Sequence, residues 1–576
     1  MRGKLRVPSL SVLMVVTASC GIPVEPADFV LQNGVVVTVD SLRPQAEAVA
    51  VAGDRIVAVG SDREISRYVG ENTEVFDLEG RTLIPSFIEG HGHFMGLGNA
   101  KMILDLTQVS NWGEIVSMVD HVVGDTRADE WILGRGWHQE KWDAVPEGSV
   151  DGVPTHESLS SVSPNNPVFL THASGHAGFA NGRAMELAGI SRNTRNPPGG
   201  EIVHDARGEP TGLLRETAQG LVRRVTSLAD GERSPNERVA RARRAVELAG
   251  GDLLSKGITS FHDAGSSFET IDFLRELAES GNLPVRLYVM VRGESNEVMA
   301  EKLPDYFMVG AANNFLTVRS IKRQIDGALG PHGAWLLEPY EDLTESTGLM
   351  LEPVDEIERT AEIAIQHGFQ VNTHAIGDRA NREVLDIYAR VFAAVGDGPD
   401  RRWRIEHAQH IHPDDVPRFA ELGVIASMQG IHATSDGPWV FKRLGSDRAE
   451  SGAYLWRSLD DAGVVVTNGT DVPVEDADPI ASFYASVSRI LADGSEFFAG
   501  QRMTREEALR SYTLNNAYAA FEENEKGSIT PGKLADLVVL SHNIMTVPME
   551  EIPAAEVLYT ILGGEIVFRR DTVTAQ

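Results

Sequence analysis

The chain has 576 residues, of which 42% are hydrophobic and 23% are charged, the composition of an ordinary globular protein. This composition excludes a disordered chain and a protein that crosses a membrane many times. Acidic side chains outnumber basic ones by 83 to 52, and the resulting formal charge of -31 argues against nucleic acid as a partner, because such a surface repels polyanions.

The first 20 residues have the pattern of a secretory signal. Three basic residues precede the apolar run 10–16, and the small residues 17–19 lead into Cys20, the only cysteine of the chain. The pattern resembles the lipobox of bacterial lipoproteins, in which the cysteine is acylated and anchors an exported protein to a membrane, here facing the periplasm. The alternative is plain cleavage near Ser19, which would give a soluble periplasmic or secreted protein.

Alternating apolar and polar residues near both ends of the chain predict short antiparallel strands and hairpins. The hairpin turns are predicted at Asn33-Gly34, Gly53-Asp54 and Gly563-Gly564. We expect segments 27–82 and 525–572 to join into one composite β-sandwich. The strand-forming stretches within them are 29–39, 46–60, 73–85, 534–540 and 556–568.

Eight short β-rich runs lie between these ends, and most are followed by a helix-like segment such as 378–395. Strands that alternate with helices predict an α/β fold, a (β/α)8 TIM barrel over 83–524, whose active site lies at the carboxyl ends of its strands. The runs are 83–88, 258–262, 285–291, 318–325, 370–374, 403–407, 424–428 and 464–468.

One interval between the runs is too long for a single barrel connection. About 160 residues separate the first run from the second, so we expect an insertion over about 94–256, beside the active-site face. Hairpins are predicted within it around 168–179 and 201–212.

Side chains that bind metals follow several of the runs. His91 and His93 are two residues apart on an extended segment, so both imidazoles can face one metal ion. Because the strand ends of a barrel meet at one rim, a metal site is predicted there. The other candidates lie at or just past four further strand ends: Lys322, His374, His407 and Asp471.

Each candidate also has a simpler interpretation. A single buried histidine is usually a hydrogen-bonded core residue, and Lys322 with Arg323 could be a basic pair on the surface. Asp326 and Asp378 are explained by a turn and by a helix N-terminus. The metal interpretation rests on the whole set and not on any one position.

Several motifs together resemble the amidohydrolase family 3 group, which includes the YtcJ-like proteins and the N-substituted formamide deformylases. The resemblance covers essentially the whole mature chain, with smaller matches at 134–137, 174–176 and 532–536. Glu89 and the segment Pro331-His332-Gly333 depart from the family pattern, although neither removes a proposed ligand. The main motifs are IPSFIEGHGH at 84–93, KRQIDG at 322–327, HAIGDR at 374–379, IEHAQ at 405–409, HATSD at 432–436 and GTDVPV at 469–474.

The resemblance implies a metal centre and a role for each ligand. In the family the motif lysine is carboxylated by CO2 and bridges two metal ions, usually Zn²⁺, and this role would fall on Lys322; one or two ions per chain are expected. A metal-activated hydroxide would attack the carbonyl, and Asp471 would carry the proton to the leaving nitrogen. The first ion would be held by His91, His93 and Asp471, and the second by His374 and His407.

The expected function is hydrolysis of a non-peptide C–N bond, as in an N-acyl or N-formyl amine. An esterase, a lactonase or a cyclic-amide hydrolase is an alternative, because the same hydroxide can attack other carbonyls. A third is a binding lipoprotein with an inactive barrel, which would be expected to lack Lys322 or Asp471. The expected partners are a small-molecule amide, a membrane reached through acylated Cys20, and a second copy of the chain in a homodimer.

Five residues are candidates for contact with the substrate. His432, Ser435 and Asp436 follow the seventh run, where a loop-stabilising turn is the alternative interpretation. His176 and Trp137 lie in the insertion, although buried aromatic residues more often pack in a core.

Overall fold

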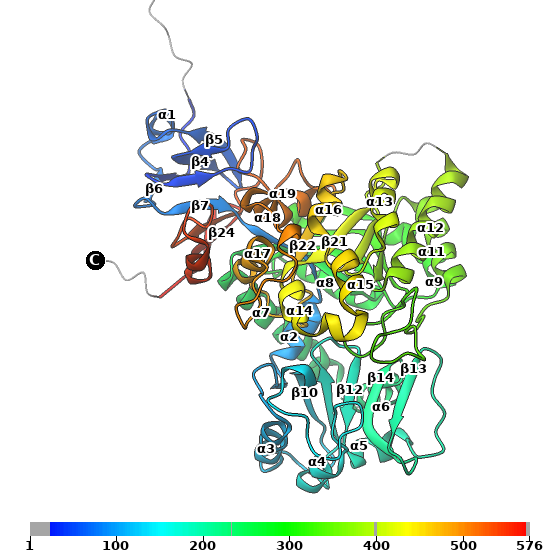
Figure 1. Ribbon diagram of the computed structural model, residues 1–576. Helices are drawn as coiled ribbons and strands as arrows, with labels where there is room; N and C mark the ends of the chain where they lie inside the picture. Colours follow the sequence, from blue (N-terminus) through cyan, green and yellow to red (C-terminus); the bar gives the residue numbers. More distant parts are fainter. Residues whose placement is uncertain (1–23, 232, 397–399, 572–576) are drawn as a thin grey trace, which may run out of the picture.

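The computed structural model describes residues 24–231, 233–396 and 400–571 and has three parts (Figure 1). A central barrel lies between a β-rich part, built from both ends of the chain, and a separate sheet drawn in cyan. The predicted signal segment 1–20 and Cys20 lie outside the described residues. Within those residues, no helix is long and apolar enough to cross a membrane.

The barrel consists of eight parallel strands, as the sequence predicts. They are hydrogen-bonded in the order β22-β21-β20-β19-β18-β16-β15-β8, with the short β17 (Met308–Gly310) paired to β18. The strands are β8 (Phe87–Gly92), β15 (Ile258–Ser266), β16 (Arg286–Val291), β18 (Leu316–Gln324), β19 (Gln370–Ala375), β20 (Arg404–His407), β21 (Ile425–Gln429) and β22 (Val466–Gly469).

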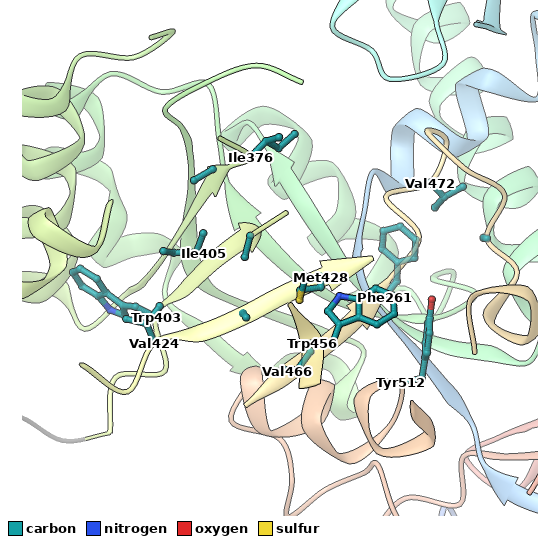
Figure 2. Close-up of a cluster of buried hydrophobic side chains, with 14 of the residues drawn as sticks. Phe261, Ile376, Trp403, Ile405, Val424, Met428, Trp456, Val466, Val472 and Tyr512 are labelled. Carbon is teal, nitrogen blue, oxygen red and sulfur yellow. The ribbon is translucent and has the colours of Figure 1, made fainter. Parts of the chain in front are cut away.

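Helices cover the outside of the barrel, and the longer ones pack against it through an apolar face. In α12, Val384, Tyr388 and Val391 recur at helical spacing and are buried. Tyr388 packs edge-on against Trp403, and Figure 2 shows Trp403 beside Ile405 in this core. The covering helices are α7 (Pro235–Ser255), α8 (Phe268–Glu279), α9 (Asn296–Tyr306), α10 (Ala311–Asn314), α11 (Val354–His367), α12 (Asp378–Val395), α13 (Val416–Leu422), α14 (Gly430–Leu444), α15 (Ser446–Gly452), α16 (Trp456–Asp461), α17 (Pro479–Ser488), α18 (Arg505–Ser511) and α19 (Leu514–Ala519).

The first and last barrel strands meet through a side chain and a close backbone approach. The Asn516 side-chain amide donates to the carbonyl oxygens of Ile88 on β8 and Asn468 on β22, at 2.6 and 2.8 Å. A Cβ atom on Gly90 would lie 2.4 Å from the Asn468 carbonyl oxygen, so only glycine allows this approach. The barrel therefore closes beside His91, which lies in β8, and Asp471, which follows β22.

We expect Asn516→Ala to lower the free energy of unfolding by about 2–3 kcal/mol, because two buried carbonyl groups lose their donor. Urea denaturation monitored by circular dichroism measures this loss. Asn282→Ala is the matched control, since the Asn282 side chain is exposed and bonds only to Ser280. Equal stabilities of the two variants would contradict the closing role of Asn516.

The β-rich part combines strands from both ends of the chain in two sheets. One has the order β5-β4-β1-β6 and the other β25-β24-β23-β7-β2-β3. The strands are β1 (Phe29–Gln32), β2 (Val35–Val37), β3 (Gln45–Ala46), β4 (Ala48–Ala52), β5 (Arg55–Gly60), β6 (Glu74–Asp77), β7 (Thr82–Pro85), β23 (Leu537–Leu540), β24 (Val557–Leu562) and β25 (Glu565–Arg569); the short α1 (Asp62–Ile65) follows β5.

Two details of this part differ from the sequence prediction. The turn at Asn33-Gly34 does not join a hairpin, because β1 and β2 belong to different sheets and pair in parallel with β6 and β7. The predicted run 83–88 is also two strands, since Pro85 ends β7 and Phe87 begins β8. An uninterrupted apolar run does not reveal that its two halves pair with different partners.

Most of the stretch between β8 and β15, up to the end of α6, forms the third part, and both predicted hairpins are present in it. Its sheet has the order β13-β14-β12-β11-β10-β9. The strands are β9 (Leu104–Asp105), β10 (Ile132–Trp137), β11 (Val168–His172), β12 (Ala177–Ala180), β13 (Gly200–His204) and β14 (Pro210–Glu216), and the helices are α2 (Phe94–Ala100), α3 (Trp112–Val123), α4 (Glu157–Val162), α5 (Gly182–Ala188) and α6 (Gln219–Gly231).

Candidate metal centre

The barrel brings the predicted ligands together at the carboxyl ends of its strands. Ligand atoms of His91, His407 and Asp471 all lie within 4.8 Å of one another. The His374 ring lies 4.4 Å from the His407 ring, measured between centroids. Lys322 points into the same group, with Nζ 3.3 Å from His91 Nε2. These five residues come from β8, β18, β19, β20 and the segment after β22, so the cluster exists only in the closed barrel.

His93 lies at the edge of this cluster. Its Nε2 is 3.2 Å from Asp471 Oδ1, while its side chain remains 30% exposed. Burial alone would raise the pKa of Asp471, but the hydrogen bond from His93 and the charges of His91 and His407 hold it well below its usual range. Asp471 therefore carries an anionic carboxylate at neutral pH.

The Lys322 amine is 2% exposed. Burial lowers its pKa to about 8, although the nearby carboxylate of Glu406 acts in the opposite direction. A lysine of this kind carries an unprotonated amine far more often than a lysine in water.

The backbone is strained at two of the ligands. His407 has φ 76° and Asp471 has φ 56°, in the left-handed region that L-residues rarely adopt. Such a conformation costs about 1–3 kcal/mol and persists only where surrounding contacts fix it. One such contact is the Asp471 N–H, which donates to the His91 carbonyl oxygen at 2.8 Å. The strain turns both side chains toward the centre of the barrel rim.

Glu406 and Gln429, for which the sequence predicted no role, orient His91 and His407. His91 Nδ1 lies 2.5 Å from Glu406 Oε2, and His407 Nδ1 lies 2.8 Å from Gln429 Oε1. Because Nδ1 donates to an oxygen in both rings, the Nε2 lone pairs are left for a metal ion. Burial would raise the pKa of Glu406, but His91, Arg404 and Lys322 lower it to about 2. The sequence offered one sign of the role of Glu406, which was a glutamate within a predicted buried strand.

We expect Glu406→Gln to weaken zinc binding about 10- to 100-fold, because it removes the charge that makes His91 a strong ligand. Competition with a fluorescent zinc chelator measures the change. Glu421→Gln is the control, since Glu421 lies in an exposed position on α13. Unchanged zinc affinity in Glu406→Gln would contradict the orienting role.

Two further buried carboxylates hold the segments that carry the ligands. Asp326 accepts the backbone N–H groups of Trp335, Ile376 and Gly377, which ties the loops after β18 and β19 together. Glu89 accepts the backbone N–H of Thr470 at 2.6 Å and its hydroxyl at 3.0 Å. Glu89 therefore fixes the segment before Asp471 against β8.

The chemistry of this donor set fits a divalent metal ion. His374 Nε2 is buried and has no hydrogen-bond partner among the described residues, and a buried polar atom without a partner is costly. Imidazole nitrogen and carboxylate oxygen are common ligands of Zn²⁺. The residues that the structure describes contain no cysteine.

Two cavities meet at the cluster, and both are lined by His176, His374, His407 and Asp471. The first has a volume of about 50 Å³, and its lining includes Leu329, His432, Asp436 and Trp439. The second is larger, about 550 Å³, and extends from the cluster along the inserted sheet. The second cavity thus has space for a substrate beside the candidate centre.

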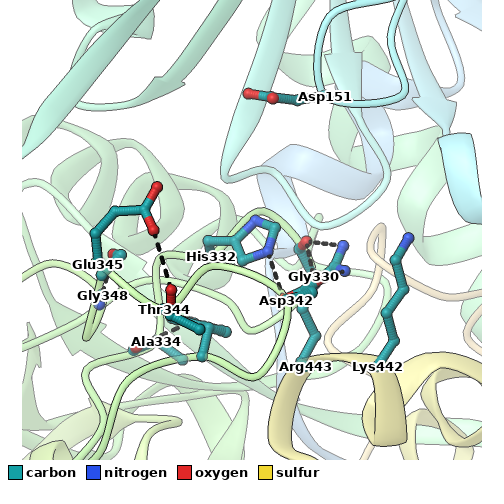
Figure 3. A network of polar contacts seen from close by, with 12 residues as sticks. Asp151, Gly330, His332, Ala334, Asp342, Thr344, Glu345, Gly348, Lys442 and Arg443 are labelled. Atoms are coloured by element: carbon teal, nitrogen blue, oxygen red, sulfur yellow. Dashed lines mark hydrogen bonds and ion pairs between the residues drawn. The ribbon is translucent and has the colours of Figure 1, made fainter.

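A buried ion pair holds one wall of the first cavity. Arg443 of α14 donates to Asp342 Oδ2 at 2.5 Å and to the Gly330 carbonyl oxygen at 2.7 Å, and His332 Nε2 lies 3.1 Å from Asp342 Oδ1 (Figure 3). Gly330 lines the cavity, so this network fixes the loop after β18 against α14. His332, one of the residues that depart from the family pattern, belongs to the network that holds this wall.

The five candidate substrate residues occupy different places. His432 and Asp436 line the first cavity, and His176 lines both cavities with Nδ1 2.8 Å from Glu216 Oε2. His432, Ser435 and Asp436 lie on α14 and not in a turn, and Ser435 lines neither cavity. Trp137 also lines neither; it packs against Trp142 and Phe179, and its Nε1 donates to the Leu170 carbonyl oxygen.

Comparison with known proteins identifies the family. The model of the amidohydrolase family matches residues 74–568. The chain is 34% identical over 555 residues to Protein LONG AFTER FAR-RED 3 of Arabidopsis thaliana, covering 94% of this chain and 91% of that one. It is 29% identical over 561 residues to N-substituted formamide deformylase of Arthrobacter pascens, covering 94% and 98%.

A solved structure shares the fold. The crystal structure of an uncharacterized metal-dependent hydrolase from Pyrococcus furiosus has a TM-score of 0.68 and 28% sequence identity, covering 90% of this chain and 100% of that one. Three observations point to the same family. They are the barrel fold, the cluster of histidine, lysine and aspartate side chains at its strand ends, and the family match over most of the chain. The chain belongs to the amidohydrolase family, and it is a hydrolase with a candidate metal centre at the rim of its barrel.

Proposed function

We propose that the protein hydrolyses a non-peptide amide bond, as in an N-acyl or N-formyl amine, at the centre where the two cavities meet. The observation that carries the proposal is the group of ligand atoms from His91, His407 and Asp471, which borders both cavities through His407 and Asp471. The similarity to an N-substituted formamide deformylase over nearly the whole chain supports an amide as the substrate.

We assign the metal ligands as follows. A bound divalent metal, which we take to be Zn²⁺, would lower the pKa of a water molecule and polarise the substrate carbonyl. Carboxylation of Lys322 would turn a buried amine into an anionic ligand that balances two divalent charges. One ion would be held by His91, His93 and Asp471 and another by His374 and His407, with Lys322 between them.

Asp471 is assigned the proton transfer. Its carboxylate is anionic, borders both cavities and can accept a proton from the attacking water. It would then deliver the proton to the leaving nitrogen, because an amine leaves poorly without one. His176, which lines both cavities and is oriented by Glu216, is placed to contact the substrate beside the scissile bond.

Metal content and turnover test this function together. Zinc is measured by mass spectrometry on purified protein, and hydrolysis is followed for N-formyl amines, N-acetyl amines and matched esters. We expect one or two equivalents of zinc and turnover of the amides. Turnover of the esters or of cyclic amides alone would assign the centre to those substrates, and absence of both metal and turnover would refute the proposal.

The carbamate has its own test. Protein loaded with zinc in ¹³C-bicarbonate is expected to show a carbamate resonance by NMR, and Lys322→Arg is expected to lack it, because a guanidinium does not react with CO2. A spectrum without this resonance in the zinc-loaded wild-type protein would leave Lys322 as an uncarboxylated residue.

A further inference from the structure

Three arginines from distant parts of the chain line the second cavity. Arg135 lies in β10 of the inserted sheet, Arg223 lies in α6, and Arg292 follows β16 of the barrel. His407 and Asp471 of the candidate metal centre line the same cavity. A group bound by the arginines would therefore share one cavity with the scissile bond.

None of these guanidinium groups has a carboxylate partner among the described residues. Arg135 donates to the carbonyl oxygens of Pro473 and Ala173 at 3.1 and 2.8 Å. Arg223 donates to Gln219 Oε1 at 2.9 Å, and Arg292 donates to Gln324 Oε1 at 2.7 Å. All of these acceptors are neutral, so the three positive charges are not neutralised by ion pairs.

Some buried arginines of this protein have carboxylate partners, whereas others, such as Arg404 and Arg489, donate to backbone carbonyl oxygens in the packed core. Arg286 pairs with Asp536 at 2.8 Å, and Arg443 pairs with Asp342 at 2.5 Å. A buried charge is normally paired, because moving it out of water is costly. Arg135 and Arg292 are half-buried and Arg223 is exposed, so these three unpaired charges differ from the core arginines in facing the space of one cavity, where a ligand can reach them.

The acidic residues of the cavity are already engaged by other groups. Glu216 binds His176, and Asp263 accepts the Phe94 backbone N–H at 2.9 Å and the Ser266 hydroxyl at 2.7 Å. Asp471 belongs to the metal centre. Desolvation lowers the pKa of Arg135 to about 10, and the charge of Arg223 contributes to the lowering, but the group stays protonated at neutral pH.

We propose that the second cavity binds a carboxylate group of the substrate. A guanidinium presents planar, paired donors that match a carboxylate, and several of them around one anion replace its hydration shell. The first cavity instead offers Leu329, Ile376 and Trp439, which suit an apolar group. The inference rests on the proposed amide hydrolysis and narrows the substrate to amides that carry a carboxylate near the scissile bond.

A matched substrate pair tests the inference. Formate release is measured from N-formyl-phenylalanine and from N-formyl-phenylalaninamide, which differ only in the carboxylate. Wild-type protein is expected to have kcat/KM about tenfold or more higher for the carboxylate, and the double variant Arg223→Gln with Arg292→Gln is expected to bring this ratio close to one. Arg135 is not varied, because it also holds Pro473 beside the metal centre.

Arg390→Gln is the control, since Arg390 pairs with Glu358 on the outer helices and is expected to leave the ratio unchanged. Calorimetric titration with 3-phenylpropanoate and 3-phenylpropan-1-ol, which has no hydrolysable bond, measures binding without turnover, with the carboxylate expected to bind more tightly. Equal kcat/KM for the two substrates in the wild type, or an unchanged ratio in the double variant, would overturn the inference and leave amide hydrolysis intact. Selective binding of 3-phenylpropanoate without any formate release would refute the proposed hydrolysis and support the carboxylate site.

Discussion

Asp471→Asn is expected to lower kcat for an N-formyl amine by about three orders of magnitude, because the amide cannot accept and return the proton. Asparagine is the right replacement at this position. Asp471 has φ 56°, and asparagine tolerates the left-handed conformation better than most residues. The backbone conformation should therefore not change. Steady-state kinetics measures the loss, and the zinc content of the variant is determined in parallel.

The control for this variant lies in the same segment. Asp476 is exposed and forms an ion pair with Lys256 at 2.5 Å, so Asp476→Asn should change kcat less than about twofold. If Asp471→Asn kept its zinc and more than about a tenth of its activity, its role in proton transfer would be wrong. Loss of zinc together with activity would instead show that Asp471 is needed mainly to bind the metal.

Removing His91 and His93 together is expected to remove the zinc ion assigned to them and, with it, turnover. His91 Nε2 lies among the ligand atoms of the cluster, and His93 borders it through Asp471. Each lost imidazole removes a nitrogen ligand that no neighbouring side chain can replace. Mass spectrometry of the double alanine variant, after dialysis against zinc, measures the remaining metal.

The His91 change has a second consequence that must be separated from metal loss. Without His91, the buried Glu406 loses its partner at 2.5 Å, and an unpaired buried charge destabilises a protein by about 3–5 kcal/mol. Adding Glu406→Gln to the double variant should recover part of this stability in urea denaturation without restoring zinc. His412→Ala is the surface control, because its side chain is 40% exposed. Full zinc content in the folded double variant would refute the assignment of the centre.

The cluster at the barrel rim could largely be predicted from the sequence, because strand periodicity is local. Each strand of the barrel is a short apolar run, and the residue that follows it must lie at the same rim as the others. This reasoning placed His374 and Asp471 near each other although they are far apart in the chain. It could not find Glu406 or Gln429, since a polar residue in a buried strand gives no sign of the ring nitrogen to which it bonds.

The sequence by itself determined the alternation of strands and helices, the residues available as ligands and the family of the protein. Only the tertiary structure decided that Pro85 separates two sheets, that Trp137 packs in the core of the inserted sheet, and that Arg135, Arg223 and Arg292 share one cavity. The reason is physical: periodicity and turn preferences act between neighbours in the chain, whereas strand pairing and charge compensation depend on groups that meet only when the barrel closes.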